Sequence, residues 1–108
     1  MTYWSKPESI SLPANTWVNG SHSINLPAGS YVISAYAALP SGAGVAYISI
    51  DGMDVYEQCI SIPASGSARR ATVACVVFFT SGATLRVRIL SDTAVTATDC
   101  EISAIRVG

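Results

Sequence analysis

Residues Ala71 to Ile89 read ATVACVVFFTSGATLRVRI and hold two neighbouring strand patterns of different kinds. The first half is apolar in both of its alternating sets, which are Val73, Cys75, Val77 and Phe79 on one side and Ala74, Val76 and Phe78 on the other. The second half is apolar in one set only, with Leu85, Val87 and Ile89 on one side and Arg86 and Arg88 on the other. Because successive strand side chains point to opposite faces, the first strand is predicted to be buried on both faces and the second on one. We therefore expect the first strand to have two covers, namely the opposite sheet and a partner such as another subunit.

The composition is that of one small domain with little charge. The chain has 108 residues, of which 50% are hydrophobic and only 12% are charged, about half the usual charged share of a soluble domain. The formal net charge is −1 and the 6 basic residues are scattered, which argues against a nucleic-acid-binding surface. A low-charge exterior suits a protein packed against partners, and it equally suits an uncharged extracellular or viral surface.

The sequence shows neither an export signal nor a membrane span. The N-terminus MTYWSKPES lacks a basic start followed by an apolar run, and no apolar stretch is long enough to cross a bilayer. The 3 cysteines, Cys59, Cys75 and Cys100, are odd in number and lack the spacing of metal ligands. We expect them to stay reduced in a cytosol and to act as small hydrophobes on strand faces, although the sequence does not exclude a disulfide.

The whole chain is predicted to be all-β. No apolar pattern of helical period extends over ten residues, and β-branched residues alternate with turns rich in Gly, Pro, Ser and Asn. Residues 1–7 are predicted to form an N-terminal arm outside any strand, with Tyr3 and Trp4 laid over the open end of the fold or over a neighbouring subunit. Residues 8–108 are predicted to form a single domain that begins with the strand Glu8 to Leu12.

The predicted strands fall into two groups that indicate two sheets. Residues 30–39, 72–80 and 98–107 carry apolar side chains on both faces, whereas residues 45–50, 53–60 and 83–90 have one polar face. If each group forms its own sheet, one sheet faces water and the other faces a partner. About eight strands in a chain of this length predict a two-sheet antiparallel jelly-roll sandwich.

Asp51-Gly52 lies between two alternating runs and predicts a tight two-residue hairpin. Such a hairpin pairs Ile48 with Val55 and places Tyr47 opposite Tyr56 on the outward face. These two tyrosines could stack on a sugar ring or could form an ordinary cross-strand aromatic pair, which we favour.

The sequence contains no recognisable catalytic or metal-binding pattern. His22 is the single histidine and has no partner at a defined spacing, so it is interpreted as an exposed turn residue. Two carboxylates could in principle hydrolyse a glycoside, and the candidates are Asp51, Asp54, Glu57, Asp92, Asp99 and Glu101. Asp51 and Asp54 flank a hairpin tip, however, where Asp is expected for turn chemistry. The sequence therefore predicts a protein that is not an enzyme and that binds no cofactor or metal.

Three motifs resemble a known family. They are Gly29-x-Tyr31 opening a strand, Ile50-Asp51-Gly52 closing one, and Ser81-Gly82-Ala83-x-Leu85-x-Val87 at a corner between two sheets. Over residues 16 to 108 the chain is similar to the jelly roll of complement globular heads and tumour-necrosis-factor-like proteins, in the version found in bacteriophage structural proteins. The resemblance implies an inner sheet packed about a three-fold axis. The family's usual Asp after the corner glycine is Ala83 here, and no acidic cluster suggests calcium, so no metal site is carried over.

Together these features predict a non-enzymatic virion protein, made in the host cytoplasm, that serves as a decoration or cementing subunit of a bacteriophage capsid. Its expected partners are further copies of itself in a homotrimer and other virion proteins such as the major capsid protein, with no nucleic acid and no membrane. The alternative is a receptor-binding head at the tip of a tail fibre or spike, which recognises a cell-surface glycan or protein. The expected subunit contacts are Val76, Val77, Phe78, Phe79, Tyr36 and Ile105, and the expected arm contacts are Tyr3 and Trp4.

Overall fold

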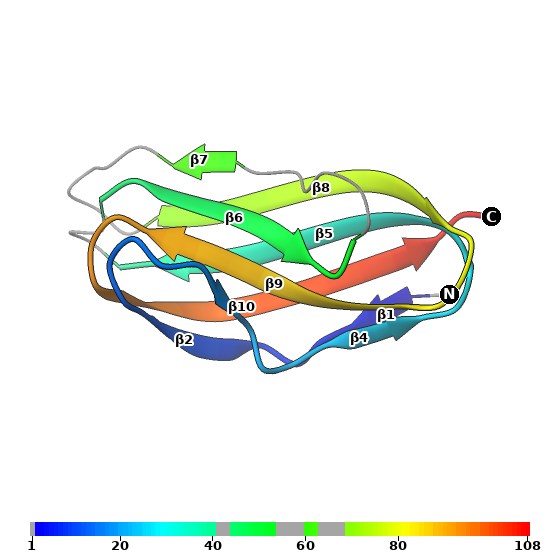
Figure 1. The fold of residues 1–108 in the computed structure, drawn as a ribbon, viewed down its shortest axis with the longest axis horizontal. Coiled ribbons are helices and arrows are strands. Elements are labelled where there is room, and N and C mark those ends of the chain that lie inside the picture. Colours follow the sequence, from blue (N-terminus) through cyan, green and yellow to red (C-terminus); the bar gives the residue numbers. More distant parts are fainter. Residues whose placement is uncertain (1, 41–43, 54–59, 63–68) are drawn as a thin grey trace.

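Two antiparallel sheets run along the long axis of the molecule (Figure 1). The computed structural model describes residues 2–40, 44–53, 60–62 and 69–108. The first sheet has the order β1-β10-β5-β8, with β2 also on β10; its strands are β1 (Thr2–Trp4), β2 (Glu8–Leu12), β5 (Gly29–Leu39), β8 (Arg69–Phe79) and β10 (Val95–Arg106). The second sheet has the order β3-β9-β6-β7, with β4 also on β9; its strands are β3 (Val18–Asn19), β4 (Ile24–Leu26), β6 (Ala46–Asp51), β7 (Ile60–Ile62) and β9 (Ala83–Ser91).

The predicted all-β jelly-roll sandwich is confirmed, and so is the sorting of its main strands. The three segments that are apolar on both faces became β5, β8 and β10, which are neighbours in the first sheet. Residues 45–50 and 83–90 became β6 and β9, which pair in the second sheet. The third predicted member, residues 53–60, falls almost wholly outside the described residues, and β7 begins at Ile60. Within the described residues, no helix is long and apolar enough to cross a membrane.

The core lies between the sheets and is centred on Tyr31 of β5. Its ring is fully buried and packs edge-on against Tyr3, at 6.0 Å between ring centroids, and against Phe79 at 6.1 Å. The Tyr31 hydroxyl donates a hydrogen bond of 2.7 Å to the backbone oxygen of Pro27. A buried phenol needs such a partner, since an unpaired hydroxyl in the core costs free energy. Tyr31 therefore fixes β1, β5 and β8 around one packing centre.

The predicted N-terminal arm is wrong in its structure, because residues 2–4 form an edge strand. β1 pairs with β10 in a register that sets Tyr3 opposite Ala104 and Trp4 opposite Ser103. Alternation then turns Tyr3 inward to the core and leaves Trp4 on the outer face of the sheet. Neither alternative for the arm applies to Tyr3, which packs within its own chain.

The predicted tight hairpin at Asp51-Gly52 is also wrong. β6 pairs with β7 so that Ile48 faces Ile60 and Tyr47 faces Ser61, which is not the register of a two-residue loop. Val55 and Tyr56 lie outside the described residues. Gly52 does have the positive φ (103°) that the Asp-Gly signal indicates, but it lies close to the backbone of β9 rather than at a hairpin tip. The Asp-Gly signal therefore predicted the backbone conformation of Gly52 correctly and the pairing of β6 incorrectly.

The predicted corner between the sheets is confirmed at residues 80–82. β8 ends at Phe79 in the first sheet, and β9 begins at Ala83 in the second. Residues 71–89 therefore cross from one sheet to the other. Its two halves differ in pattern because they belong to different sheets with different outer surroundings.

Two glycines near this corner differ sharply in what a side chain would meet. A methyl group on Gly52 would collide with the backbone oxygen of Thr84, whereas on Gly82 it would only touch that of Leu26 at 3.4 Å. Gly52 also has a φ that L-residues rarely adopt. We predict that Gly52→Ala lowers the free energy of unfolding by at least about 2 kcal/mol, and that Gly82→Ala changes it by less than about 0.5 kcal/mol. Urea denaturation of both variants measures this, and equal costs would contradict the placement of Gly52 against β9.

Candidate functional site

The outer face of the β1-β10-β5-β8 sheet carries an exposed apolar surface. Among the described residues, seven large hydrophobic side chains are exposed: Trp4, Val32, Tyr47, Val76, Phe78, Ile105 and Val107. All but Tyr47 belong to this sheet or directly follow its β10. The most exposed are Val76, at 74%, and Phe78, at 66%. We call this face, from β1 to β8, the apolar face.

The strand register joins these side chains into one continuous surface. Val32 lies between Val76 on β8 and Ile105 on β10, and all three point outward. At the next outward position of β5, Ser30 lies opposite Phe78. The Ser30 backbone oxygen accepts a 2.8 Å hydrogen bond from the Val107 amide, which brings Val107 to the same level. Since directly opposed side chains on one face touch across a strand pair, a band of apolar groups crosses the sheet.

The apolar face is also nearly uncharged. Its other outward positions on β5, β8 and β10 hold small, hydroxyl or aromatic groups, namely Ser30, Ser34, Tyr36, Ala38, Thr72, Ala74 and Ser103. Among the described positions that strand alternation turns outward, the charged residues are Arg70 on β8, which is exposed, and Glu101 on β10, which is half-buried; Asp99, in the bulge of β10 between Thr98 and Glu101, is exposed as well. A surface of this composition suits contact with another protein better than contact with water.

The structure divides the residues predicted to contact other subunits into two sets. Val76, Phe78, Tyr36 and Ile105 lie on the apolar face, together with Trp4. Val77 and Phe79 point into the sandwich, where Val77 packs against the core and Phe79 is buried, so their assignment to an interface is corrected. Val32 and Val107 were not proposed as contacts, although alternation along residues 30–39 and 98–107 already put them on this side.

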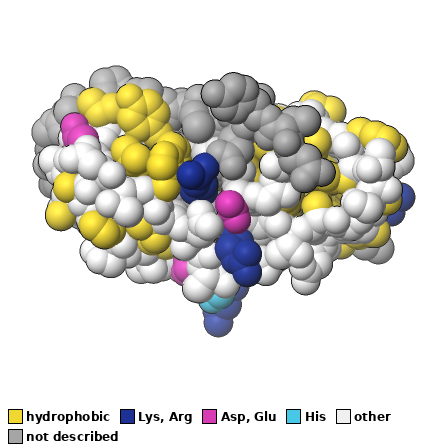
Figure 2. All heavy atoms as spheres, in the orientation of Figure 1, with side chains coloured by type: hydrophobic (Ala, Val, Ile, Leu, Met, Phe, Trp, Pro, Cys, Tyr) yellow, Lys and Arg dark blue, Asp and Glu magenta, His cyan; other side chains and the backbone are white. Residues whose placement is uncertain are grey.

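The outer face of the other sheet carries a second cluster of large side chains. Tyr47 on β6 lies opposite Leu90 on β9, and Trp17 precedes Val18, whose register partner is Ile89, so Trp17 reaches the level of Leu90. The Arg88 guanidinium lies 4.4 Å from the Trp17 ring centroid, within the range of a cation–π contact. Figure 2 shows this face, with hydrophobic side chains gathered on the left and charged side chains beside them in the middle. Tyr56, which was predicted to lie opposite Tyr47 as a cross-strand aromatic partner, is outside the described residues.

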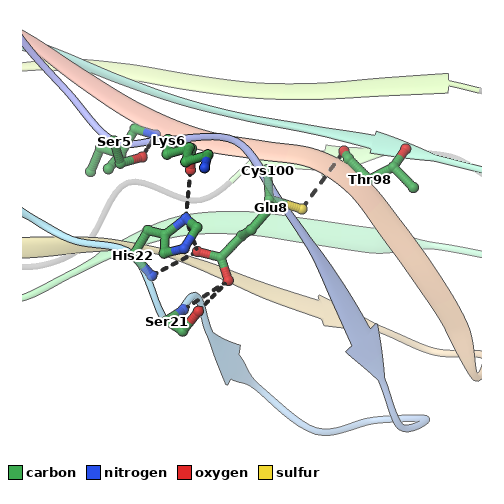
Figure 3. Close-up of polar contacts among 8 residues, drawn as sticks. Ser5, Lys6, Glu8, Ser21, His22, Thr98 and Cys100 are labelled. Carbon is green, nitrogen blue, oxygen red and sulfur yellow. Dashed lines mark hydrogen bonds and ion pairs between the residues drawn. The ribbon is translucent and has the colours of Figure 1, made fainter.

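A polar cluster joins β2 to the turn before β4 (Figure 3). The Glu8 carboxylate accepts hydrogen bonds from the Ser21 amide at 2.9 Å, the Ser21 hydroxyl at 2.8 Å and the His22 amide at 2.7 Å. Burial raises the pKa of the Glu8 carboxyl, but the backbone hydrogen bonds from Ser21 and His22, with the Ser21 hydroxyl and the His22 charge, lower it by more, so the net pKa is below its ordinary value. Glu8 thereby ties two segments that are far apart in sequence.

This cluster does not have the geometry of a hydrolase. The Ser21 hydroxyl donates to Glu8, and His22 Nδ1 lies 2.7 Å from the Lys6 backbone oxygen, which can only accept, so Nδ1 carries a proton. No serine–histidine pair is formed in which the imidazole could take the hydroxyl proton. His22 therefore lies in the turn before β4, as expected, but it is anchored there by hydrogen bonds and is only partly exposed.

The described acidic residues considered from the sequence lie at separate places in the fold, except Asp99 and Glu101, which are two residues apart on β10. Asp51 ends β6 opposite Arg86, Asp92 lies in the turn after β9, and Asp99 occupies a bulge of β10 with a φ of 53°. Asp54 and Glu57 lie outside the described residues. Across the described part of the chain, no three His, Cys, Asp or Glu side chains gather closely enough to hold a metal ion.

Two of the three cysteines act as buried hydrophobes, as expected. Cys75 is half-buried and Cys100 fully buried, and both are free thiols. Burial, with the nearby charges of Glu8 and Asp99, raises the pKa of Cys100 to about 12, and burial raises the pKa of Cys75. Both thiols therefore stay protonated at neutral pH and are poor nucleophiles. Cys59 lies outside the described residues.

A small pocket lies at the corner between β8 and β9. Its volume is about 290 Å³, and it is lined by backbone, hydroxyl and apolar groups of residues 77–84 and by Gly52. None of these lining residues is charged. The pocket therefore offers hydrogen-bonding and apolar contacts but no acid or base.

No model of a known protein family matches this chain, and no curated protein matches its sequence. Several solved structures share its fold. A chain in the structure of infectious bursal disease virus, Gx strain, has a TM-score of 0.68 at 14% identity over 100% of this chain. TmCBM61, solved with β-1,4-galactotriose, has a TM-score of 0.56 at 14% identity over 94% of this chain and 70% of its own. The carbohydrate-binding module CBM6cm-2 from Cellvibrio mixtus lichenase 5A, solved with cellotriose, has a TM-score of 0.51 at 14% identity over 99% and 98%.

These similarities establish the fold. The chain spans about a third of the viral chain that it matches, 32% of its length. Identities this low show a common architecture alone. The protein is a jelly-roll β-sandwich of a kind that occurs in viral and carbohydrate-binding proteins.

The Glu8 cluster predicts a dependence of stability on acid pH. The folded pKa lies below the ordinary 4.5, so the carboxylate's contribution is fully present above that pH and is lost as the pH falls through the folded pKa. We predict that Glu8→Gln lowers the free energy of unfolding by about 1–2 kcal/mol at pH 7 and flattens its decline below about pH 4.5. Urea titrations from pH 7 to pH 3 measure both effects. Asp99→Asn, which removes an exposed carboxylate, is the control, and a pH profile in which Glu8→Gln retains the full decline would contradict the role of Glu8.

Val76 and Val77 provide a matched pair for the two sides of β8. Both are valines in the middle of one strand, but Val76 is exposed and Val77 packs on the core. We predict that Val77→Asp lowers the free energy of unfolding by at least about 2 kcal/mol, because it buries a charge, whereas Val76→Asp changes it by less than about 1 kcal/mol in the dissociated chain. Denaturation at low protein concentration measures both. Equal losses would mean that the outer side of β8 is covered within a single chain.

Proposed function

We propose that this chain is a non-enzymatic virion protein that assembles through its apolar face into a homotrimer and binds a bacteriophage capsid as a decoration or cementing subunit. The single observation that supports this best is the concentration of exposed large hydrophobic groups on one sheet. Val76 and Phe78 are 74% and 66% exposed in the isolated chain. Soluble monomers rarely leave such groups clustered, because covering them with protein is favourable by roughly 25 cal/mol for each Å² buried.

Further copies of the chain are suitable covers for this face. In a closed ring every copy uses the same two surfaces, so the apolar groups of each copy are covered without leaving an open end. The resemblance to complement-head and tumour-necrosis-factor-like jelly rolls supports three copies with this sheet inside. The second sheet, which carries Arg86 and Arg88 on its outer side, stays in water.

A place in the virion is supported by the fold and by the absence of a chemical centre in the described residues. The same architecture occurs in a chain of infectious bursal disease virus. The Ser21, His22 and Glu8 side chains are tied to one another or to backbone in a way that holds segments together, not in a way that activates a nucleophile. The protein is made in the host cytoplasm and contacts other virion proteins, such as the major capsid protein, rather than nucleic acid or membrane.

A second candidate function is that of a receptor-binding head that recognises a cell-surface glycan. One observation favours it, namely the cluster of Trp17, Leu90 and Tyr47 on the outer face of the second sheet, with Arg88 beside it. Exposed aromatic rings can stack on sugar rings, and two carbohydrate-binding modules solved with galactotriose and cellotriose share the fold. In this case the protein would occupy the tip of a tail fibre or spike.

The copy number of the protein in purified particles separates the two candidates. Quantitative mass spectrometry against the major capsid protein is expected to find many copies for each head. A few copies for each tail would favour the receptor-binding head instead. Absence from purified particles would overturn both virion assignments.

A further inference from the structure

We propose that the copies associate in one direction, with the β8 side of one apolar face packed against the β10 and β1 side of the next, and with Arg70 of one copy facing Glu101 of the other. The inference rests on the proposed self-assembly and names the surfaces and the charged contact that produce it. The occupant of the apolar face is thus a second copy of this chain.

The apolar groups are distributed so that the two sides of the face match. Val76 on β8 and Ile105 on β10 both lie at the level of Val32, on opposite sides of β5. Phe78 is one outward position beyond that level on β8, and Trp4 is one outward position before it on β1, opposite Ser103. Rotation about an axis parallel to the strands keeps each residue at its own level. Val76 of one copy then meets Ile105 of the next, and Phe78 meets Val107, whose amide is bonded to Ser30 at the level of Phe78.

The two charged groups of the face match at the same time. Arg70 lies opposite Ala38, and Glu101 lies opposite Tyr36, which is the next outward position on β5. Arg70 is thus on the β8 side and Glu101 on the β10 side, at nearly the same level along the strands. The rotation that brings Val76 against Ile105 therefore brings a basic group against an acidic one. The pairing of opposite charges is a second match, independent of the apolar one.

Neither charge has a partner within its own copy in the described part of the chain. No salt bridge there includes Arg70 or Glu101, and two strand spacings, about 10 Å of backbone, separate β8 from β10. Covering the apolar face removes water from both side chains, and an unpaired charge in such a contact is unfavourable. A neighbour that supplies the opposite charge at the right level removes this cost for both groups. An unrelated apolar partner would leave both charges unpaired.

Reversing the charges tests this contact. Arg70→Glu and Glu101→Arg each place like charges together, so each single variant is expected to raise the dissociation constant of the oligomer about tenfold or more. The double variant, Arg70→Glu with Glu101→Arg, restores opposite charges and is expected to recover the wild-type value. Arg86→Glu, which reverses a charge on the outer side of the other sheet, is the control and is expected to leave the constant unchanged. Light scattering over a dilution series gives the mass in multiples of 11.2 kDa, and circular dichroism checks the fold.

Mixing the two single variants tests the number of copies. In a ring of even number, the variants can alternate and every contact regains opposite charges. In a ring of three, one contact always joins two identical copies, so recovery on mixing is expected to be incomplete. Complete recovery would support the Arg70–Glu101 contact and replace the trimer by an even-numbered ring.

The failure of this inference can be distinguished from the failure of the proposed function. If the wild-type chain is an oligomer that Val76→Asp dissociates, but the double reversal does not recover what the single reversals lose, the directional contact is wrong and self-assembly stands. If the wild-type chain remains a monomer of 11.2 kDa at micromolar concentration, self-assembly itself is wrong and the inference is overturned with it.

Discussion

The fold depends on the burial of the inner side of β5, the central strand between β10 and β8. Its inward side chains are Tyr31, Ile33, Ala35, Ala37 and Leu39, and none is more than 1% exposed. Since the side-chain period of a strand is two, a shift of one residue would turn this whole set to the outside. The register of the first sheet is therefore fixed by the core, and the residues between these positions have to point outward. The composition of the apolar face is a direct consequence.

What makes this protein unusual is that the residues left outside are not polar. A single-chain sandwich normally alternates apolar and polar groups on each strand, as β9 does with Leu85 and Val87 inside and Arg86 and Arg88 outside. On β8 the outside positions hold Val76 and Phe78 instead. Hydrophobic groups in both alternating sets lower the solubility of an isolated chain, which is why we propose that a second layer of protein covers the outer set.

The two faces of the sandwich can serve different roles. The apolar face is suited to contact with further copies, because its exposed hydrophobic side chains are clustered and Arg70 and Glu101 lie at nearly the same level along the strands. The outer face of the second sheet has more charge and a cluster around Tyr47 and Trp17, and it remains in water in the proposed assembly. A protein of this kind can bind its own copies through one sheet and present the other to the outside. The hydrogen bonds of Glu8 hold the two sheets together, because they tie β2 of the first sheet to the turn before β4 of the second.

The sequence by itself determined the fold class, the sheets to which β5, β8, β10, β6 and β9 belong, and the two alternating sets of β8, because alternation is a local property with a period of two. It also indicated the corner at Gly82 and the special backbone of Gly52. Only the tertiary structure decided that Tyr3 faces the core, that Ile48 pairs with Ile60, and that Glu8 binds Ser21 and His22. Strand pairing depends on the summed packing of residues far apart in the chain, which no local pattern records. For the same reason, Val77 could be separated from Val76 only once the direction of the core was known.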